Sequence, residues 1–284
     1  MSDSFGVAEA RRIFESPDLI GIGVRADEVR RRMHGARTTF VRVFELHVDA
    51  PPATLPARVS AGEFRLAGRP ASVEAAVAAV RAAVALASGA PVTGFTFNDL
   101  RVLGGASFGD VCSTLRDTGL EAVAEIQVDQ LEPGAEAAIA SARASGLALT
   151  RLTVQALAEA DPLVIVQRAS DLQGAVGGFR VFAPLPRTLS IAAPTTGYDD
   201  VKLVAIARLL AAGIESIQVD WPLYGPKLAQ FALTVGADDV DGVAAIDPGT
   251  LGPRRSPLEE IRGNIRSAAL EPVERNARYE AIGS

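Results

Sequence analysis

Residues 196–242 read TGYDDVKLVAIARLLAAGIESIQVDWPLYGPKLAQFALTVGADDVDG, and this stretch carries two helix–strand units in succession. Helices are predicted from Tyr198 to Ala212 and from Lys227 to Val235. Ser216 to Trp221 and Val240 to Ile246 are apolar runs typical of buried strands. Helices that alternate with buried strands predict a parallel sheet, because each helix returns the chain to the same edge.

The same alternation continues toward both ends of the chain. Further strands are predicted at residues 39–48, 92–97, 122–128, 147–155 and 179–183. Helices are predicted at residues 72–88, beginning at Ser72, and at 107–117, 132–145, 160–172 and 256–268. About seven such units without a linker predict an α/β fold, a TIM-like (β/α) barrel. An open doubly wound sheet is the alternative.

The barrel is expected to form a single domain over residues 1–284. Within it we expect an N-terminal helical segment at 1–38, the barrel itself at 39–250, and a C-terminal helix and tail at 251–284. Residues 51–70 contain three early prolines and scattered glycines, so we expect a loop there.

Composition excludes several classes of function. The chain has 284 residues, 28 Lys and Arg against 34 Asp and Glu, and a net charge of −6. This balance, without a basic block, gives no electrostatic reason to expect a nucleic-acid or membrane partner. No apolar run reaches the roughly 18 residues of a membrane helix, and no secretory signal is recognisable. A single Cys rules out a disulfide within the chain. We therefore expect a cytoplasmic globular protein.

Polar residues gather in the quoted stretch. In a barrel, residues at the carboxyl ends of strands surround the functional site. We expect the residues of IQVDW and of the segment GADDVDG to contact a polar small-molecule ligand, namely Gln218, Asp220, Trp221, Asp238, Asp239 and Asp241. The alternative is that the aspartates cap turns and that Trp221 fills the barrel rim.

Other candidates lie elsewhere in the chain. His47, at the end of the first strand, and the cations Arg187 and Lys227 are expected to bind ligand anions. Asp129, Asp239 and Asp241 are the candidate catalytic acids or bases. We expect no metal site, since Cys112 stands alone in an amphipathic helix and the two histidines lie in other elements.

Several segments resemble aminofutalosine synthase, a family of radical S-adenosylmethionine enzymes of the futalosine route to menaquinone. The segments that carry this resemblance are FESPDL at 14–19, RADEVRRRMHG at 25–35, GGFRVFAPLP at 177–186, the quoted stretch at 196–242 and EPVERNARY at 271–279. The resemblance implies a barrel of the radical S-adenosylmethionine type. It also implies pathway compounds such as aminofutalosine and 3-enolpyruvyloxybenzoate as ligands.

The chain departs from the family at its defining site. The family has a Cys-x3-Cys-x2-Cys motif after the first strand, whereas here FVRVFELHV leads into DAPPATLPARVSAGEFRLAGRP without a Cys. A [4Fe–4S] cluster needs cysteine thiolates. We therefore expect no cluster and do not expect S-adenosylmethionine as a cofactor. Asp129 stands where the family has a Glu.

Three functions follow as hypotheses. The first is a cluster-less homologue that serves menaquinone biosynthesis as a binding or partner subunit, pairing with an active homologue or another pathway enzyme. The second is a cofactor-independent lyase or hydrolase that acts on an enolpyruvyl or nucleoside-like compound through the barrel aspartates. The third is a radical enzyme whose cluster is held by another chain.

Overall fold

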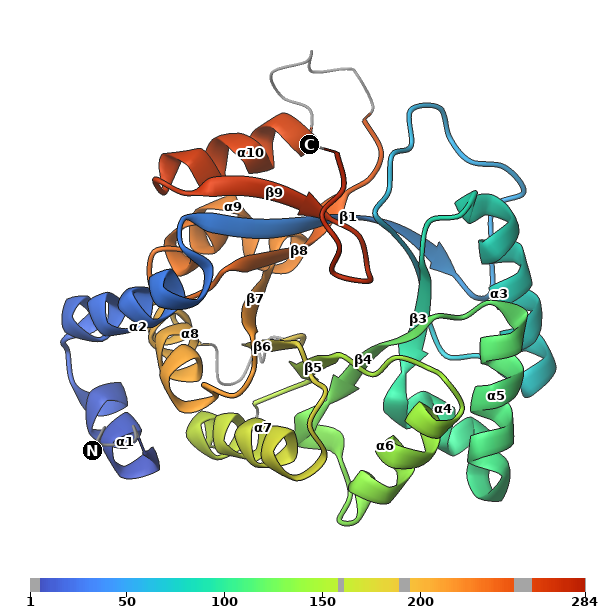
Figure 1. The fold of residues 1–284 in the computed structure, drawn as a ribbon, viewed down its shortest axis with the longest axis horizontal. Helices are drawn as coiled ribbons and strands as arrows, with labels where there is room; N and C mark the ends of the chain where they lie inside the picture. Colours follow the sequence, from blue (N-terminus) through green and yellow to red (C-terminus); the bar gives the residue numbers. More distant parts are fainter. Residues whose placement is uncertain (1–5, 158–160, 189–194, 248–256, 284) are drawn as a thin grey trace.

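The computed structural model describes residues 6–157, 161–188, 195–247 and 257–283. Its centre is a closed barrel of eight parallel strands (Figure 1). The strands follow one another around the barrel in chain order: β1 Arg37–His47, β2 Glu63–Ala67, β3 Val92–Thr96, β4 Ala122–Gln127, β5 Arg151–Val154, β6 Val181–Pro186, β7 Ser216–Asp220 and β8 Asp239–Ala244. The predicted (β/α) barrel is thereby confirmed.

Closure depends on β1, which pairs with strands from both ends of the chain. Its carboxyl half lies parallel to β2, with Val43 opposite Glu63 and His47 opposite Ala67. Its other edge lies parallel to β8, with Thr39 opposite Asp239. An open doubly wound sheet would leave β2 and β8 as separate edges, so these two pairings exclude that alternative.

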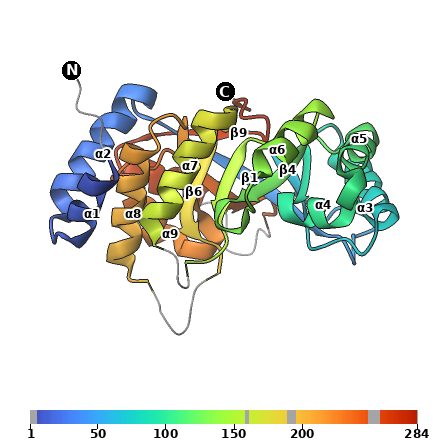
Figure 2. The ribbon, with the colours of Figure 1, turned by 90° about the horizontal axis from the view of Figure 1, so that it is seen from below.

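Helices cover the outside of the barrel (Figures 1 and 2). The helices that follow the strands are α3 Val73–Ala87, α4 Phe97–Gly104, α5 Phe108–Thr118, α6 Ala135–Ala144, α7 Pro162–Val176, α8 Gly197–Leu210, α9 Trp221–Ala232 and α10 Pro257–Ser267. Two further helices, α1 Val7–Glu15 and α2 Leu19–His34, precede β1, and α2 packs on α8. None of the helices in the described ranges has the length and apolarity needed to cross a membrane.

The loop expected at residues 51–70 is only partly a loop, because β2 lies inside it. A ninth strand, β9 Glu271–Arg275, pairs with the amino half of β1 and belongs to the sheet. Both strands are five residues long, EFRLA and EPVER, and carry two and three charged residues, so their sequences look solvent-exposed. The boundary expected at residues 250 and 251 lies outside the described residues.

The barrel separates an apolar layer from a charged interior. Between strands and helices, side chains such as Phe40, Val204 and Val240 form one continuous buried cluster. Inside the barrel, Arg65 of β2 reaches Asp241 of β8, although β1 lies between the two strands. Arg151 of β5 reaches the same carboxylate. Contacts between strands that are not neighbours can be made only across the lumen, so the lumen is filled by ion pairs.

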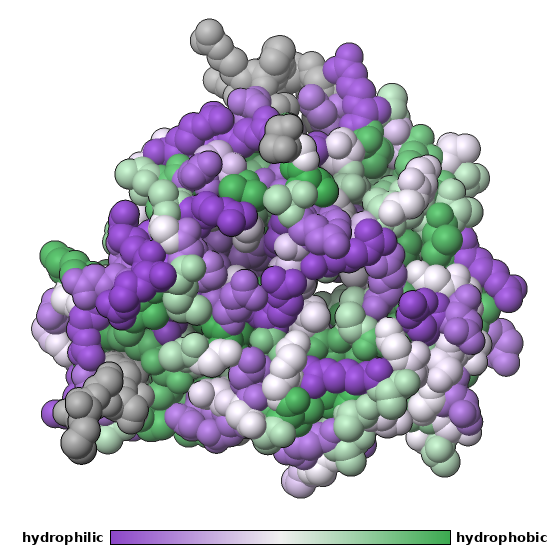
Figure 3. Space-filling view, in the orientation of Figure 1, coloured by the Kyte–Doolittle hydropathy of each residue, from purple (hydrophilic) through white to green (hydrophobic). Residues whose placement is uncertain are grey.

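The segment after β9 lies at the amino end of the barrel. Tyr279 stacks between two guanidinium groups there, at 4.4 Å from Arg275 and 4.9 Å from Arg180. Figure 3 shows polar side chains, in purple, around the middle of the face seen in Figure 1. The opposite end, where the strands terminate, is the end at which (β/α) barrels carry their functional sites.

Candidate functional site

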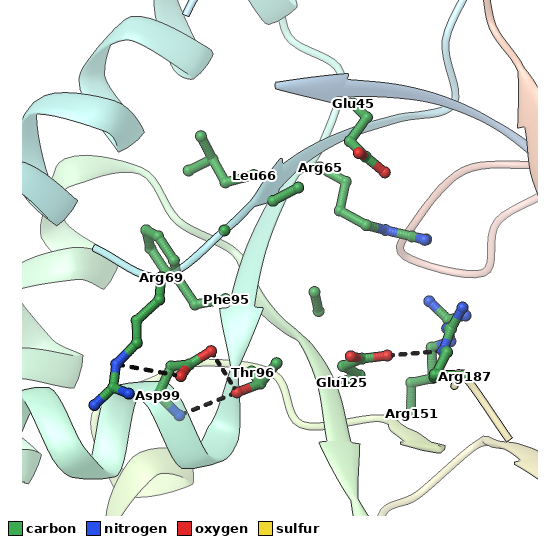
Figure 4. A pocket seen from close by; sticks show the side chains of 13 residues that line it. Glu45, Arg65, Leu66, Arg69, Phe95, Thr96, Asp99, Glu125, Arg151 and Arg187 are labelled. Atoms are coloured by element: carbon green, nitrogen blue, oxygen red, sulfur yellow. Dashed lines mark hydrogen bonds and ion pairs between the residues drawn. The ribbon is translucent and has the colours of Figure 1, made fainter. Parts of the chain in front are cut away.

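A cavity of about 300 Å³ opens at the carboxyl end of the barrel. Its walls come from the ends of the first four strands, including Glu45, Arg65, Thr96 and Glu125 (Figure 4). Arg151 of β5 and Arg187, the residue after β6, complete the lining. The cavity thus lies where strand order places the functional site of a (β/α) barrel.

Asp241 forms the charged floor beneath this cavity. It is 1% exposed and receives two hydrogen bonds from Arg65, at 2.9 and 2.8 Å, and a third from Arg151. Burial by itself would raise the pKa of Asp241, but the charges of Arg151 and Arg65 outweigh it and hold the pKa well below the usual range. Asp241 is therefore a fixed anion.

Arg187 links three carboxylates on the other side of the cavity. Its Nη1 donates to Asp220 at 2.5 Å, its Nε lies 3.1 Å from Glu125, and Nη2 lies 4.0 Å from Asp241. Burial would lower the pKa of Arg187, yet Glu125 and Asp220 raise it. Asp220 also caps α9 by accepting from the backbone N–H of Leu223. The structure thus brings together three of the residues predicted from the sequence, Arg187, Asp220 and Asp241, in one network of ion pairs.

Two other predicted residues, Gln218 and Asp239, lie in the lumen toward its amino end, and a third, Asp238, lies outside the lumen against α8; all three are away from the cavity. Asp239 is fully buried, and Arg275 donates to its two oxygens at 2.7 and 2.6 Å. Gln218 donates to Asp239 at 2.5 Å. Asp238 pairs with Arg208 and lies 3.4 Å from His34. Asp238 precedes β8 and Asp239 is its first residue, so both lie at the opposite end of the strand from the expected mouth.

The remaining predicted residues are dispersed. Asp129 accepts the backbone N–H groups of Gln155, at 2.7 Å, and Ala156, at 3.1 Å, and so fixes the end of β5. His47 has a largely exposed side chain, 72% accessible, beside Glu45. Trp221 packs against the core at the start of α9, and Lys227 is exposed on the same helix. These four residues are not in contact with the cavity.

Sequence reasoning missed four charged residues of the network: Glu63, Arg65, Glu125 and Arg151. Glu63 and Arg65 alternate with Phe64 and Leu66 in EFRLA, whereas Glu125 and Arg151 are the charges of AVAEIQ and RLTV. A charge in a short strand is the available signal. Such a charge usually indicates a solvent-facing position. In a closed barrel the same alternation points it into the lumen.

The resemblance to radical S-adenosylmethionine enzymes implies a [4Fe–4S] cluster near the end of β1. Such a cluster is held by several cysteine thiolates. The single cysteine of the chain, Cys112, is buried in α5, and burial raises its pKa to about 11. Among the described residues no group of three or more His, Cys, Asp or Glu is arranged to hold a metal ion. The donor set of this chain does not fit the cluster.

Comparison with known proteins places sequence similarity in the C-terminal part of the chain. Residues 183–283 match the family model of the CofH/MqnC C-terminal region. The aminodeoxyfutalosine synthase of Streptomyces coelicolor is 35% identical over 140 residues, which cover 41% of this chain and 36% of that protein. The corresponding enzyme of Thermus thermophilus is 33% identical over 131 residues, covering 41% and 35%.

A second group of relatives carries a different enzyme name. The 5-amino-6-(D-ribitylamino)uracil–L-tyrosine 4-hydroxyphenyl transferase of Methanothermobacter thermautotrophicus is 36% identical over 127 residues, 39% of this chain and 34% of that protein. Each of these matches covers little more than a third of the relative's own length. The segments at 14–19 and 25–35 lie outside the family match.

Solved structures share the fold over almost the whole chain. Methylornithine synthase (PylB) superposes with a TM-score of 0.66, covering 95% of each chain at 13% identity. The hydrogenase maturase HydG from Carboxydothermus hydrogenoformans gives 0.67, covering 97% of this chain and 77% of that one at 12% identity. The protein is therefore a closed (β/α) barrel of the kind seen in these solved structures, and its own residues 183–283 are similar to the CofH/MqnC C-terminal region.

Proposed function

We propose that this protein is a cluster-less homologue of aminodeoxyfutalosine synthase that binds a compound of the futalosine route to menaquinone. It acts in that route as a binding or partner subunit. The observation that carries the proposal is the cavity at the carboxyl end of the barrel, whose lining includes Arg65, Arg151 and Arg187. The sequence similarity supports the choice of pathway.

The same proposal assigns no cluster-dependent radical chemistry to this chain. Its support is the donor set: β1 runs into residues 48–62, which contain no Cys, and Cys112 is buried in a helix on the outside of the barrel. A polar cavity at the barrel mouth does not require a cluster to bind a ligand. Binding and iron content can therefore be measured independently.

The test is calorimetric and thermal-shift titration of iron-assayed protein with aminofutalosine, 3-enolpyruvyloxybenzoate and S-adenosylmethionine. A compound that binds the native state raises the melting temperature by mass action. Ala67→Phe fills the cavity wall without removing an ion pair and should abolish binding, whereas Ala85→Phe on the exposed face of α3 should leave it unchanged.

Two results would contradict the proposal. One is stoichiometric iron with S-adenosylmethionine cleavage after anaerobic reconstitution. The other is that none of the three compounds binds and that the protein also fails to co-elute with a cluster-containing aminodeoxyfutalosine synthase or another enzyme of the route. Binding that Ala67→Phe does not weaken would place the ligand outside this cavity.

The alternative is a cofactor-independent lyase or hydrolase with Asp129, Asp239 and Asp241 as acids or bases. It stays a prediction, and the contacts of these carboxylates do not favour it. Asp239 and Asp241 are each held by guanidinium groups, and Asp129 is engaged with backbone N–H groups. A general base must be able to take up a proton from a substrate within reach.

A further inference from the structure

Arg151 is a buried cation whose hydrogen-bonding capacity is largely unused. Its side chain is 5% exposed. Within the described residues its Nη2 donates to Asp241, and its buried Nε has no partner. A guanidinium carries five N–H donors, and a buried donor without an acceptor destabilises the folded state. The position therefore lacks an acceptor.

Neighbouring arginines in the lumen do not share this deficit. Arg65 makes two bonds to Glu63, at 2.7 and 2.9 Å, in addition to its two bonds to Asp241. Arg275 makes two bonds to Asp239 and one, at 3.0 Å, to the Asn276 carbonyl. The charge environment differs in the same sense: burial lowers the pKa of Arg151, whereas carboxylates raise the pKa of Arg65 well above its usual range despite burial.

Arg151 also lines the mouth of the barrel, where an acceptor from solution can approach its guanidinium group. Arg151 lines the cavity of about 300 Å³ and also a pocket of about 20 Å³ below it. The lower pocket has room for about one water molecule, so it cannot hold a ligand. Figure 4 shows Arg151 and Arg187 on the same side of the upper cavity, with Arg65 facing them. Carboxylates line this cavity as well, but Arg65 and Arg187 are already paired with carboxylates of the chain, which leaves Arg151 as the guanidinium with spare donors there.

We propose that Arg151 anchors a carboxylate group of the ligand in the mouth cavity, so that the protein selects carboxylate-bearing small molecules. A carboxylate forms a charge-assisted hydrogen bond with a guanidinium N–H, and Asp241 engages only one nitrogen of Arg151. This inference deepens the proposed function and rests on the same cavity. It adds the chemical class of the ligand and the residue that selects it.

The experiment compares a carboxylate with its neutral amide. Benzoate, benzamide and 3-enolpyruvyloxybenzoate are titrated into the wild type, Arg151→Gln and Arg151→Lys by calorimetry and ligand-observed NMR. Arg180→Gln is the control, because Arg180 precedes the neighbouring strand β6 but its side chain pairs with Glu215 at the amino end of the barrel. The melting temperature of each variant is measured in parallel.

The wild type and Arg180→Gln should bind benzoate about 10-fold or more tightly than benzamide, as expected for a charge-assisted pair. In Arg151→Gln this ratio should fall close to one, with Arg151→Lys between the two. The ratio is insensitive to a uniform loss of folded protein, so it separates recognition from stability.

The possible failures are distinguishable. If Arg151→Gln keeps the preference for benzoate, or if no carboxylate binds the wild type at tens of millimolar, the role of Arg151 is refuted. If 3-enolpyruvyloxybenzoate binds equally well to the wild type and Arg151→Gln, the proposed function survives and the anchor does not. If benzoate binds through Arg151 while no pathway compound binds, the anchor stands and the proposed pathway falls.

Discussion

Asp241 illustrates what closure of a barrel does to one carboxylate. It lies between two guanidinium groups in a lumen where solvent is almost excluded. Asp241→Asn keeps the shape of the side chain but removes the countercharge of Arg65 and Arg151. Removing one partner of a buried ion pair costs about 3–5 kcal/mol, so we expect a loss of that order in the free energy of unfolding at pH 7. Urea denaturation measures it, with Asp117→Asn on exposed α5 as the control.

The same carboxylate predicts how stability depends on pH. The pKa of Asp241 is lower in the folded protein than in the unfolded chain, where it is near 4. As pH falls through about 4, the unfolded state takes up this proton first, so the free energy of unfolding decreases until the folded carboxyl is protonated as well. Asp241→Asn should show a shallower decrease below pH 4. An identical slope in both proteins would mean that Asp241 does not carry this dependence.

At the scale of elements, helix starts were predictable because they depend on a few adjacent residues. The sequence predicts helices at residues 72–88 and 160–172, and the side chains of Ser72 and Asp161 cap them by accepting backbone N–H groups, from Ala75 at 3.2 Å and from Leu163 at 3.0 Å. The short strands β2 and β9 are not predictable from local sequence, because Arg65 and Arg275 find their lumen partners, Asp241 and Asp239, far away in the sequence. Local signals therefore identified caps and long helices better than short strands.

The cap of α3 can be measured directly. Ser72→Ala removes the acceptor for the first turn and should lower the free energy of unfolding by about 1 kcal/mol, while Ser72→Gly should cost only a few tenths. Urea titration of the three proteins at one pH gives both differences. Equal losses in the two variants would indicate that contacts of the Ser72 side chain other than the cap are responsible.

At the scale of the whole molecule, the fold class could be predicted and the assembled site only in part. The order of alternating elements implies a barrel whatever the details of each strand. Asp220, Asp241 and Arg187 were found from their places near strand ends, and they join one network. Arg65 and Arg151 could not be assigned to it, because their contacts cross the lumen and exist only after β1 has paired with both β2 and β8.

Closure of the barrel also predicts that breaking a buried ion pair at its amino end lowers the free energy of unfolding of the whole fold. Arg275 and Arg278 lie three residues apart. Arg275 donates two hydrogen bonds to the carboxylate of Asp239, and Arg278 donates two to the carboxylate of Glu121. The first pair is buried, with side chains 4% and 1% exposed, and the second is 45% and 34% exposed. Arg275→Met should therefore cost about 3–5 kcal/mol, and Arg278→Met at most about 1 kcal/mol.

Two probes decide whether the loss in Arg275→Met is global. Far-ultraviolet circular dichroism follows all helices, and Trp221, the only tryptophan of the sequence, reports on the junction of β7 and α9. Because β9, β1 and β8 are consecutive in the sheet, disruption at Arg275 should shift both transitions together. Equal effects of the two substitutions would show that burial does not set the strength of these pairs. Separate transitions would show that the C-terminal segment unfolds independently of the barrel.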